Sequence, residues 1–121
     1  MVLRYTKLPT VRQLRVAESI KEAVCEIFAR NEPSFIFLEK IFVTVSEVRI
    51  AADLKLATIF VATIMSVDKV ELISFLNDNL PQIKHLLAKK IHLKYVPMIR
   101  FMYDNSFDEG AKINALLHEI K

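Results

Sequence analysis

The sequence has one cysteine, one glycine, no tryptophan and no long apolar run. The single cysteine and the missing apolar run each exclude a class of protein. Because Cys25 is alone, no disulfide can form within the chain, and nothing indicates an oxidising compartment. No apolar run approaches the roughly 18 residues needed to cross a bilayer, and the first residues lack the apolar core of a secretory signal. The sequence therefore predicts a cytoplasmic protein without a membrane-spanning segment.

Catalytic and metal-binding motifs are also missing. The sequence shows no paired carboxylates suited to acid–base catalysis, no nucleophile elbow and no glycine-rich phosphate loop. His85 and His92 lie seven residues apart with no cysteine, aspartate or glutamate between them, which matches no common ligand spacing. We therefore expect no catalytic residues, no metal and no cofactor, in a protein that is not an enzyme.

Acidic residues are absent from two segments that are rich in basic ones. Residues 1–17 carry Arg4, Lys7, Arg12 and Arg15, and residues 79–103 carry Lys84, Lys89, Lys90, Lys94 and Arg100. The remaining eight basic and 14 acidic residues leave the rest of the chain at a net charge of −6. This uneven distribution favours a nucleic-acid partner over an anionic membrane surface. Two solvated faces without a partner are the alternative.

The apolar pattern predicts one α+β domain over residues 1–121, with residues 1–9 as a flexible arm. The first helix is expected over residues 10–30, opened by a capping box of Thr10 and Gln13. Its apolar stripe, which predicts the buried face, consists of Ala17, Ile20, Val24, Ile27 and Phe28.

Three strands are expected. Val43–Ser46 alternates as a half-buried strand does, and a bulge near Ser46 and Glu47 would keep the following apolar residue pointing inward. Ala57–Ile64 is rich in β-branched residues and, after a short connection, should pair with the first strand in antiparallel fashion. Met98–Tyr103 also alternates and predicts the third strand, with the helices on one side of the sheet.

Two helices joined end to end are predicted between the second and third strands. Ser66 or Asp68 should cap the first of them. Asn79-Leu80-Pro81 is interpreted as a joint, because proline ends a preceding helix but suits the first turn of a new one. The expected inward-facing residues are Val70, Ile73 and Leu76 in the first helix and Ile83, Leu86, Leu87 and Ile91 in the second. A capping box of Ser106 and Glu109 predicts a closing helix.

The outer side of the helix after the joint is the best candidate for contact with RNA phosphates. It carries the predicted stripe Lys84, His85, Lys89 and His92, with Lys94 and Arg100 nearby. Arg12 and Arg15, in the first two turns of the first helix, are a second candidate, because they oppose the helix dipole there. The opposing interpretation is that these side chains are only a solvated face.

In order and spacing, the chain resembles the bacterial ribosome-binding factor A family over about residues 10–120. The resemblance is carried by Arg12-x-x-Arg15-Val16-Ala17-x-x-Ile20, by Val43–Ser46, by Asp53-Leu54, by Ile83 with Leu86-Leu87, and most strongly by Val96-Pro97-x-x-Arg100-Phe101-x-Tyr103-Asp104-x-Ser106. It implies a type II KH fold and binding to the small ribosomal subunit and its ribosomal RNA during late maturation. It also implies a part in pre-rRNA processing and in cold growth, no enzymatic activity, and a monomer.

One departure from KH proteins bears on the mechanism. Ordinary KH domains hold the nucleic-acid backbone with a GxxG loop, and this chain has only Gly110. The family instead has an Ala-x-Gly kink between helices, where this chain has Asn79-Leu80-Pro81. Contact with RNA should therefore come from side chains. A protein-interaction module acting on another assembly factor, or a KH-like RNA-binding protein unconnected with ribosomes, are the alternatives.

Overall fold

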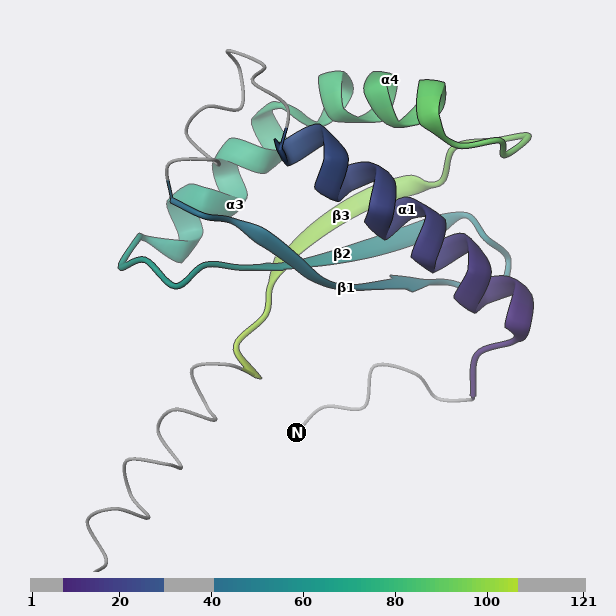
Figure 1. Ribbon diagram of the computed structural model, residues 1–121, viewed down its shortest axis with the longest axis horizontal. Helices are drawn as coiled ribbons and strands as arrows, with labels where there is room; N and C mark the ends of the chain where they lie inside the picture. Colours follow the sequence, from purple (N-terminus) through teal and green to yellow (C-terminus); the bar gives the residue numbers. More distant parts are fainter. Residues whose placement is uncertain (1–7, 30–40, 107–121) are drawn as a thin grey trace, which may run out of the picture.

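The computed structural model describes residues 8–29 and 41–106, which form three helices on one face of a three-stranded sheet (Figure 1). In chain order the elements are α1 (Val11–Ala29), β1 (Thr44–Ile50), β2 (Leu56–Ala62), α3 (Lys69–Asp78), α4 (Leu80–Lys90) and β3 (Met98–Tyr103). This arrangement confirms the predicted α+β class. The closing helix predicted beyond Ser106 and most of the predicted N-terminal arm lie outside the described residues.

The start of α1 confirms the predicted capping box. The backbone N–H of Thr10 donates to Gln13 Oε1 at 2.8 Å, and that of Gln13 donates to Thr10 Oγ1 at 3.1 Å. These reciprocal bonds satisfy two donors that would otherwise lack partners. Gln13 is buried, and its Nε2 also donates to the backbone oxygen of Ile50 at 3.1 Å. The start of α1 is thereby tied to the end of β1.

The sheet has the strand order β1-β2-β3, with β1 antiparallel and β3 parallel to β2. Because parallel strands need a crossover, the α3–α4 pair has to span the sheet between β2 and β3. The register of β1 on β2 shifts between Val45 and Glu47, which confirms the predicted bulge. The shift allows Val45, Val48 and Ile50 all to be buried.

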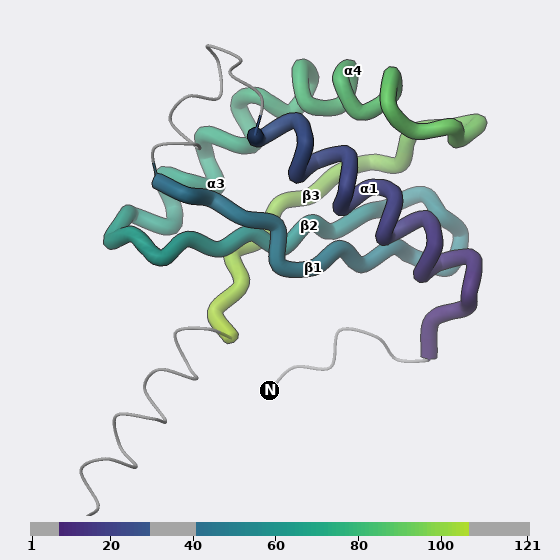
Figure 2. The backbone as a smooth tube through the Cα atoms, in the orientation of Figure 1, coloured from purple at the N-terminus to yellow at the C-terminus, as the bar shows by residue number. Residues whose placement is uncertain are grey.

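A single apolar core fills the space between the sheet and the helices, and Figure 2 shows α1 passing over the strands beside the α3–α4 pair. Phe28 of α1 meets Phe101 of β3, with ring centroids 6.3 Å apart. The predicted stripe of α1 is buried in full: Ala17, Ile20, Val24, Ile27 and Phe28. The largest fully buried side chains also include Ile50, Ile59, Val61, Leu72, Leu76, Ile83 and Leu87.

The predicted inner side of α3 is partly wrong. Val70 is 79% exposed, whereas Leu72 and Leu76 are completely buried. Val70 and Leu72 are two residues apart, about 200° around the helix axis, so both cannot face the core. Packing of the helix against its neighbours selects the rotation that buries the two leucines.

Asp68 is the cap of α3, and its removal should be measurable. The Asp68 carboxylate accepts the backbone N–H groups of Val70 at 2.9 Å and Glu71 at 3.1 Å. We expect Asp68→Ala to lower the free energy of unfolding by about 1 kcal/mol, as loss of an N-cap commonly does. Urea denaturation followed by circular dichroism measures this. Ser66→Ala is the control, because the Ser66 side chain makes no hydrogen bond within the described residues; an equal loss there would contradict the assignment.

The joint between α3 and α4 is confirmed at the predicted place. Asn79 is both the C-cap residue of α3 and the N-cap residue of α4. Its backbone N–H and its side-chain Nδ2 both donate to the oxygen of Phe75, and its own backbone oxygen accepts the N–H of Ile83 at 3.0 Å. Pro81 lies in the first turn of α4, where a missing donor has no intrahelical partner to lose. Asn79 therefore belongs to the caps of both helices.

Candidate nucleic-acid interface

The outer face of α4 carries three of the predicted contact residues. Lys84, His85 and Lys89 are all exposed, on the side of the helix away from the buried Ile83 and Leu87. The helix contains no acidic residue that could neutralise them. Its outer face is therefore open to an anionic partner.

His92 does not continue this face, which corrects the predicted stripe. The helix ends at Lys90, and Ile91 is extended and buried, so the chain turns before His92. Lys90, on the apolar side of α4, forms an ion pair with Glu26 of α1, with 2.8 Å between Lys90 Nζ and Glu26 Oε1. Lys90 therefore joins two helices, and His92 is exposed beyond the end of α4.

A groove between α1 and the end of α4 brings the two cationic segments of the sequence together. It has a volume of about 380 Å³, and its lining includes Arg15 and Ser19 of α1 and His92. Glu22 and Glu26 line it as well, so the groove carries charges of both signs and is not by itself an anion pocket. Arg15 and His92, far apart in the sequence, are nevertheless neighbours in the fold.

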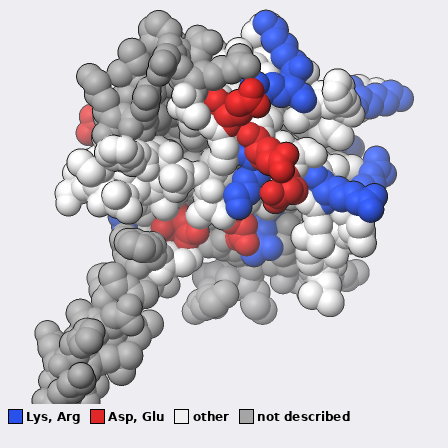
Figure 3. Space-filling view, in the orientation of Figure 1, with Lys and Arg blue, Asp and Glu red and all other residues white. Residues whose placement is uncertain are grey.

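Four segments meet at one end of the molecule, on the right in Figures 1 and 2: the start of α1, the β1–β2 turn, the end of α4 and the start of β3. We call the exposed basic residues of these segments the basic end; they are Arg12, Arg15, Lys55, Lys89, His92 and Lys94. In Figure 3 several Lys and Arg side chains lie toward this side, while the Asp and Glu side chains lie nearer the middle of the view, with further Lys and Arg side chains beside them.

Lys55 is the member of the basic end that the sequence did not predict. Its backbone oxygen accepts the N–H of Met98 at 2.9 Å, which places the β1–β2 turn beside the start of β3. Asp53 lies in the same turn, and its carboxylate accepts the backbone N–H of Lys55 at 3.0 Å. Only the parallel pairing of β2 with β3 brings this lysine near the segment 79–103.

Arg100 lies apart from the helices, on the other face of the sheet. Its neighbours Ile99 and Phe101 point into the core, so Arg100 points to the face that no described helix covers. Its Nη2 donates to Thr58 Oγ1 at 3.1 Å. The predicted contact residues therefore occupy two faces of the molecule.

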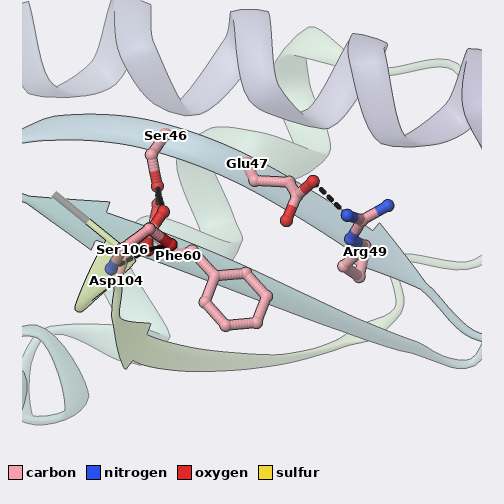
Figure 4. A network of polar contacts seen from close by, with 6 residues as sticks. All are labelled: Ser46, Glu47, Arg49, Phe60, Asp104 and Ser106. Carbon is pink, nitrogen blue, oxygen red and sulfur yellow. Dashed lines mark hydrogen bonds and ion pairs between the residues drawn. The ribbon is translucent and has the colours of Figure 1, made fainter. Parts of the chain in front are cut away.

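At the far end of β3, the buried Asp104 carboxylate joins β1 to the chain that follows β3 (Figure 4). Asp104 accepts Ser46 Oγ at 2.6 Å and the backbone N–H of Ser106 at 2.9 Å, and the Ser106 hydroxyl donates to it as well. Ser46 is the bulged residue of β1, and on the same strand Glu47 pairs with Arg49. The Asp104 and Ser106 positions, which carry part of the sequence resemblance, thus fasten the bulge to the chain that leaves β3.

The described part of the chain contains no group of three His, Cys, Asp or Glu side chains that could hold a metal ion. Nor does any helix within it combine the length and apolar character that crossing a membrane requires. Cys25 is exposed on α1 and forms no disulfide.

Sequence similarity relates the chain to ribosome-binding factors. The profile of the family described as ribosome-binding factor A matches residues 12–117. Ribosome-binding factor A of Zymomonas mobilis is 40% identical over 108 residues, which cover 89% of this chain and 77% of that protein. The Nitrobacter winogradskyi protein of the same name is 42% identical over 106 residues, which cover 88% and 77%.

Solved structures show the same fold. The crystal structure of ribosome-binding factor A from Thermus thermophilus gives a TM-score of 0.63 at 18% identity, over 78% of this chain and 97% of that one. The solution structure of a Thermotoga maritima protein gives 0.63 at 24% identity, over 82% and 92%. Coordinates of the Thermus factor fitted into a cryo-EM map of a 30S complex give 0.57 at 19% identity, over 74% and 91%. The fold is thus the KH-like one that the resemblance implied, and the chain belongs to the ribosome-binding factor A family.

Proposed function

We propose that this chain is a non-catalytic assembly factor that binds the small ribosomal subunit through its ribosomal RNA, during late maturation and pre-rRNA processing. Membership of the ribosome-binding factor A family supports ribosome binding, and the relative fitted into a 30S complex supports the small subunit. On this proposal the protein works in the cytoplasm as a single-domain monomer and supports growth in the cold.

The observation that carries the proposal is the meeting of two acid-free segments at the basic end. Basic side chains contributed by separate elements give a broad cationic surface, which suits the closely spaced phosphates of folded RNA. Phosphate contacts supply affinity and position more than sequence choice. With a single glycine in the chain, a GxxG clamp is impossible, so side chains have to make these contacts.

We assign the phosphate contacts to the outer face of α4 together with the basic end. This surface contains Lys84, His85, Lys89, His92 and Lys94, with Arg12 and Arg15 from α1 and Lys55 from the β1–β2 turn. Arg100 would contact RNA only from the opposite face of the sheet. The Asn79-Leu80-Pro81 joint has the separate role of aiming α4, because its backbone groups are engaged within the two helices.

Sedimentation of a cell lysate through a sucrose gradient tests the proposed function. We expect the protein to migrate with free small subunits and to be absent from assembled ribosomes, because an assembly factor leaves before the subunits join. Immunoblotting of the fractions measures this. Migration with all RNA-containing fractions would instead indicate a general KH-like RNA-binding protein, and migration with none would contradict ribosome binding.

A protein-interaction module is the second candidate, and exposed apolar side chains favour it. Phe42, Ile64 and Met65 are exposed where β1 begins and β2 ends, and Val70 is exposed on α3. Apolar side chains of this size are common in protein contacts. Treatment with ribonuclease discriminates between the candidates: association that survives digestion of the RNA supports a protein partner.

A further inference from the structure

The segment between α4 and β3 is anchored at both ends and from beneath. The backbone N–H of Ile91 donates to the backbone oxygen of Leu87 at 3.1 Å, and the backbone N–H of Met98 donates to the backbone oxygen of Lys55 at 2.9 Å. Ile91 and Pro97 are buried, while Leu93 and Val96 pack against the core as half-buried residues. The backbone of residues 91–97 is therefore held in place by its own apolar side chains.

These anchors turn three other side chains outward. His92, Lys94 and Tyr95 are exposed, and Tyr95 is 76% exposed. Within the described residues, the Tyr95 hydroxyl has no hydrogen-bond partner. A large aromatic ring on a fixed backbone, without a packing role, is poorly explained by the stability of the fold.

Tyr103 shows what a structural tyrosine does in the same molecule. Its ring is half-buried, and its hydroxyl donates to the backbone oxygen of Thr63 at 3.3 Å and accepts the Thr63 N–H at 3.4 Å. Lys69 Nζ lies over its ring, 4.6 Å from the centroid. Tyr103 thus contributes to the sheet, in contrast to Tyr95.

The surroundings of Tyr95 are cationic and slightly apolar. Lys94 Nζ lies 5.6 Å from the centroid of the Tyr95 ring, close to the limit of about 6 Å for a cation–π contact, so the contact is weak and easily exchanged. Lys55 lies in the β1–β2 turn and the exposed Met98 lies at the adjoining start of β3. Residues 92–103 include no acid that would repel an anion.

An aromatic face with lysines beside it fits an unpaired nucleotide. The ring stacks on a base of any sequence, and a lysine ammonium pairs with the adjoining phosphate. A base within a duplex is stacked on both sides and offers no face to Tyr95. A protein contact of this size would instead be expected to have an apolar patch around the ring, whereas the recorded neighbour of the ring is the Lys94 ammonium.

We propose that Tyr95 is a stacking platform for an unpaired nucleotide of the bound RNA, with Lys94 and Lys55 holding the adjoining phosphates. This inference rests on the proposed RNA-binding function and adds to it the class of RNA recognised at the basic end. It places this contact in the segment between α4 and β3, which also carries the predicted contact residues His92 and Lys94.

Binding of the full chain to a fluorescently labelled oligoadenylate of about 12 nucleotides, compared with the same strand annealed to oligouridylate, tests the platform. We expect Tyr95→Ala to weaken binding to the single strand roughly five- to hundredfold and to change duplex binding little. Tyr95→Phe should restore single-strand binding, whereas Tyr95→Leu, which is apolar but has no aromatic face, should not. Val70→Ala, a truncation of a similarly exposed apolar side chain on α3, is the control and should have no effect.

Tyr95→Trp provides a direct signal, because the natural chain contains no tryptophan. Its fluorescence should be quenched when oligoadenylate saturates the protein, as stacking requires. The proposal is overturned if the wild-type chain binds no oligoadenylate, if Tyr95→Leu binds as tightly as the wild type, or if the tryptophan signal does not change. Sucrose gradients of the wild-type and Tyr95→Ala proteins distinguish this proposal from the proposed function. If both proteins migrate with small subunits but oligoadenylate binding does not depend on Tyr95, the stacking platform is overturned and the proposed function stands. Tyr95-dependent binding without co-migration overturns the function alone.

Discussion

Lys84→Glu combined with Lys89→Glu is expected to abolish co-sedimentation of the protein with small ribosomal subunits, a loss of affinity of at least about a hundredfold. Both lysines are exposed on the outer face of α4, and that helix has no acidic residue. Reversal removes two phosphate contacts and places two repelling carboxylates in the same positions. Pelleting of purified small subunits with increasing protein measures the affinity, and circular dichroism checks that the fold is intact.

Salt provides an independent measurement of the same effect. Raising the salt concentration from about 50 to 200 mM should weaken wild-type binding by orders of magnitude, because phosphate contacts release condensed counterions.

The control for the α4 variant is Lys21→Glu combined with Lys69→Glu. This variant changes the net charge equally but away from the basic end and the outer face of α4, so it should bind small subunits almost normally. If the α4 variant still co-sediments, or if binding is insensitive to salt, these lysines are only a solvated face.

Leu87→Ala is expected to lower the free energy of unfolding by about 2–5 kcal/mol, a large part of the stability of a domain this size. Leu87 is completely buried in α4, so its truncation removes apolar contacts and leaves a cavity. Leu86→Ala is the matched control: the same change at the next residue, where the side chain is half-buried. It should cost roughly 1 kcal/mol.

Urea denaturation of the wild type and of both variants measures these differences. Equal losses at the two positions would contradict the rotation of α4 about its axis that the structure shows. That rotation also decides which lysines face outward, so this experiment bears on the candidate interface as well as on stability.

Several local features were predictable because short-range interactions set them. The capping box of Thr10 and Gln13 is made by groups three residues apart, and the Asn79-Leu80-Pro81 joint follows from what proline does to its own turn. The bulge near Ser46 was visible as a break in alternation. In each case the determining atoms are neighbours in the chain.

The wrong predictions concern features that the sequence pattern leaves open and that packing of the core determines. The apolar residues of α3 permit more than one rotation about its axis, and burial of Leu72 and Leu76 left Val70 exposed. The stripe on α4 was extended to His92 because basic residues continue past the helix, yet burial of Ile91 ends it earlier. Both outcomes depend on contacts with the rest of the core, and the spacing of residues within one helix does not reveal those contacts.

The sequence by itself determined the class of fold, the order of its elements, the family and the presence of two acid-free cationic segments. Tertiary structure alone decided how those segments meet: the hydrogen bond from Gln13 to Ile50 and the parallel pairing of β3 bring Arg15, His92 and Lys55 to one end. Alternation along β3 already put Arg100 on the face away from Ile99 and Phe101, and the structure adds its hydrogen bond to Thr58. The reason is physical: charge is a property of each residue, whereas a charged surface depends on long-range contacts that only the folded chain makes.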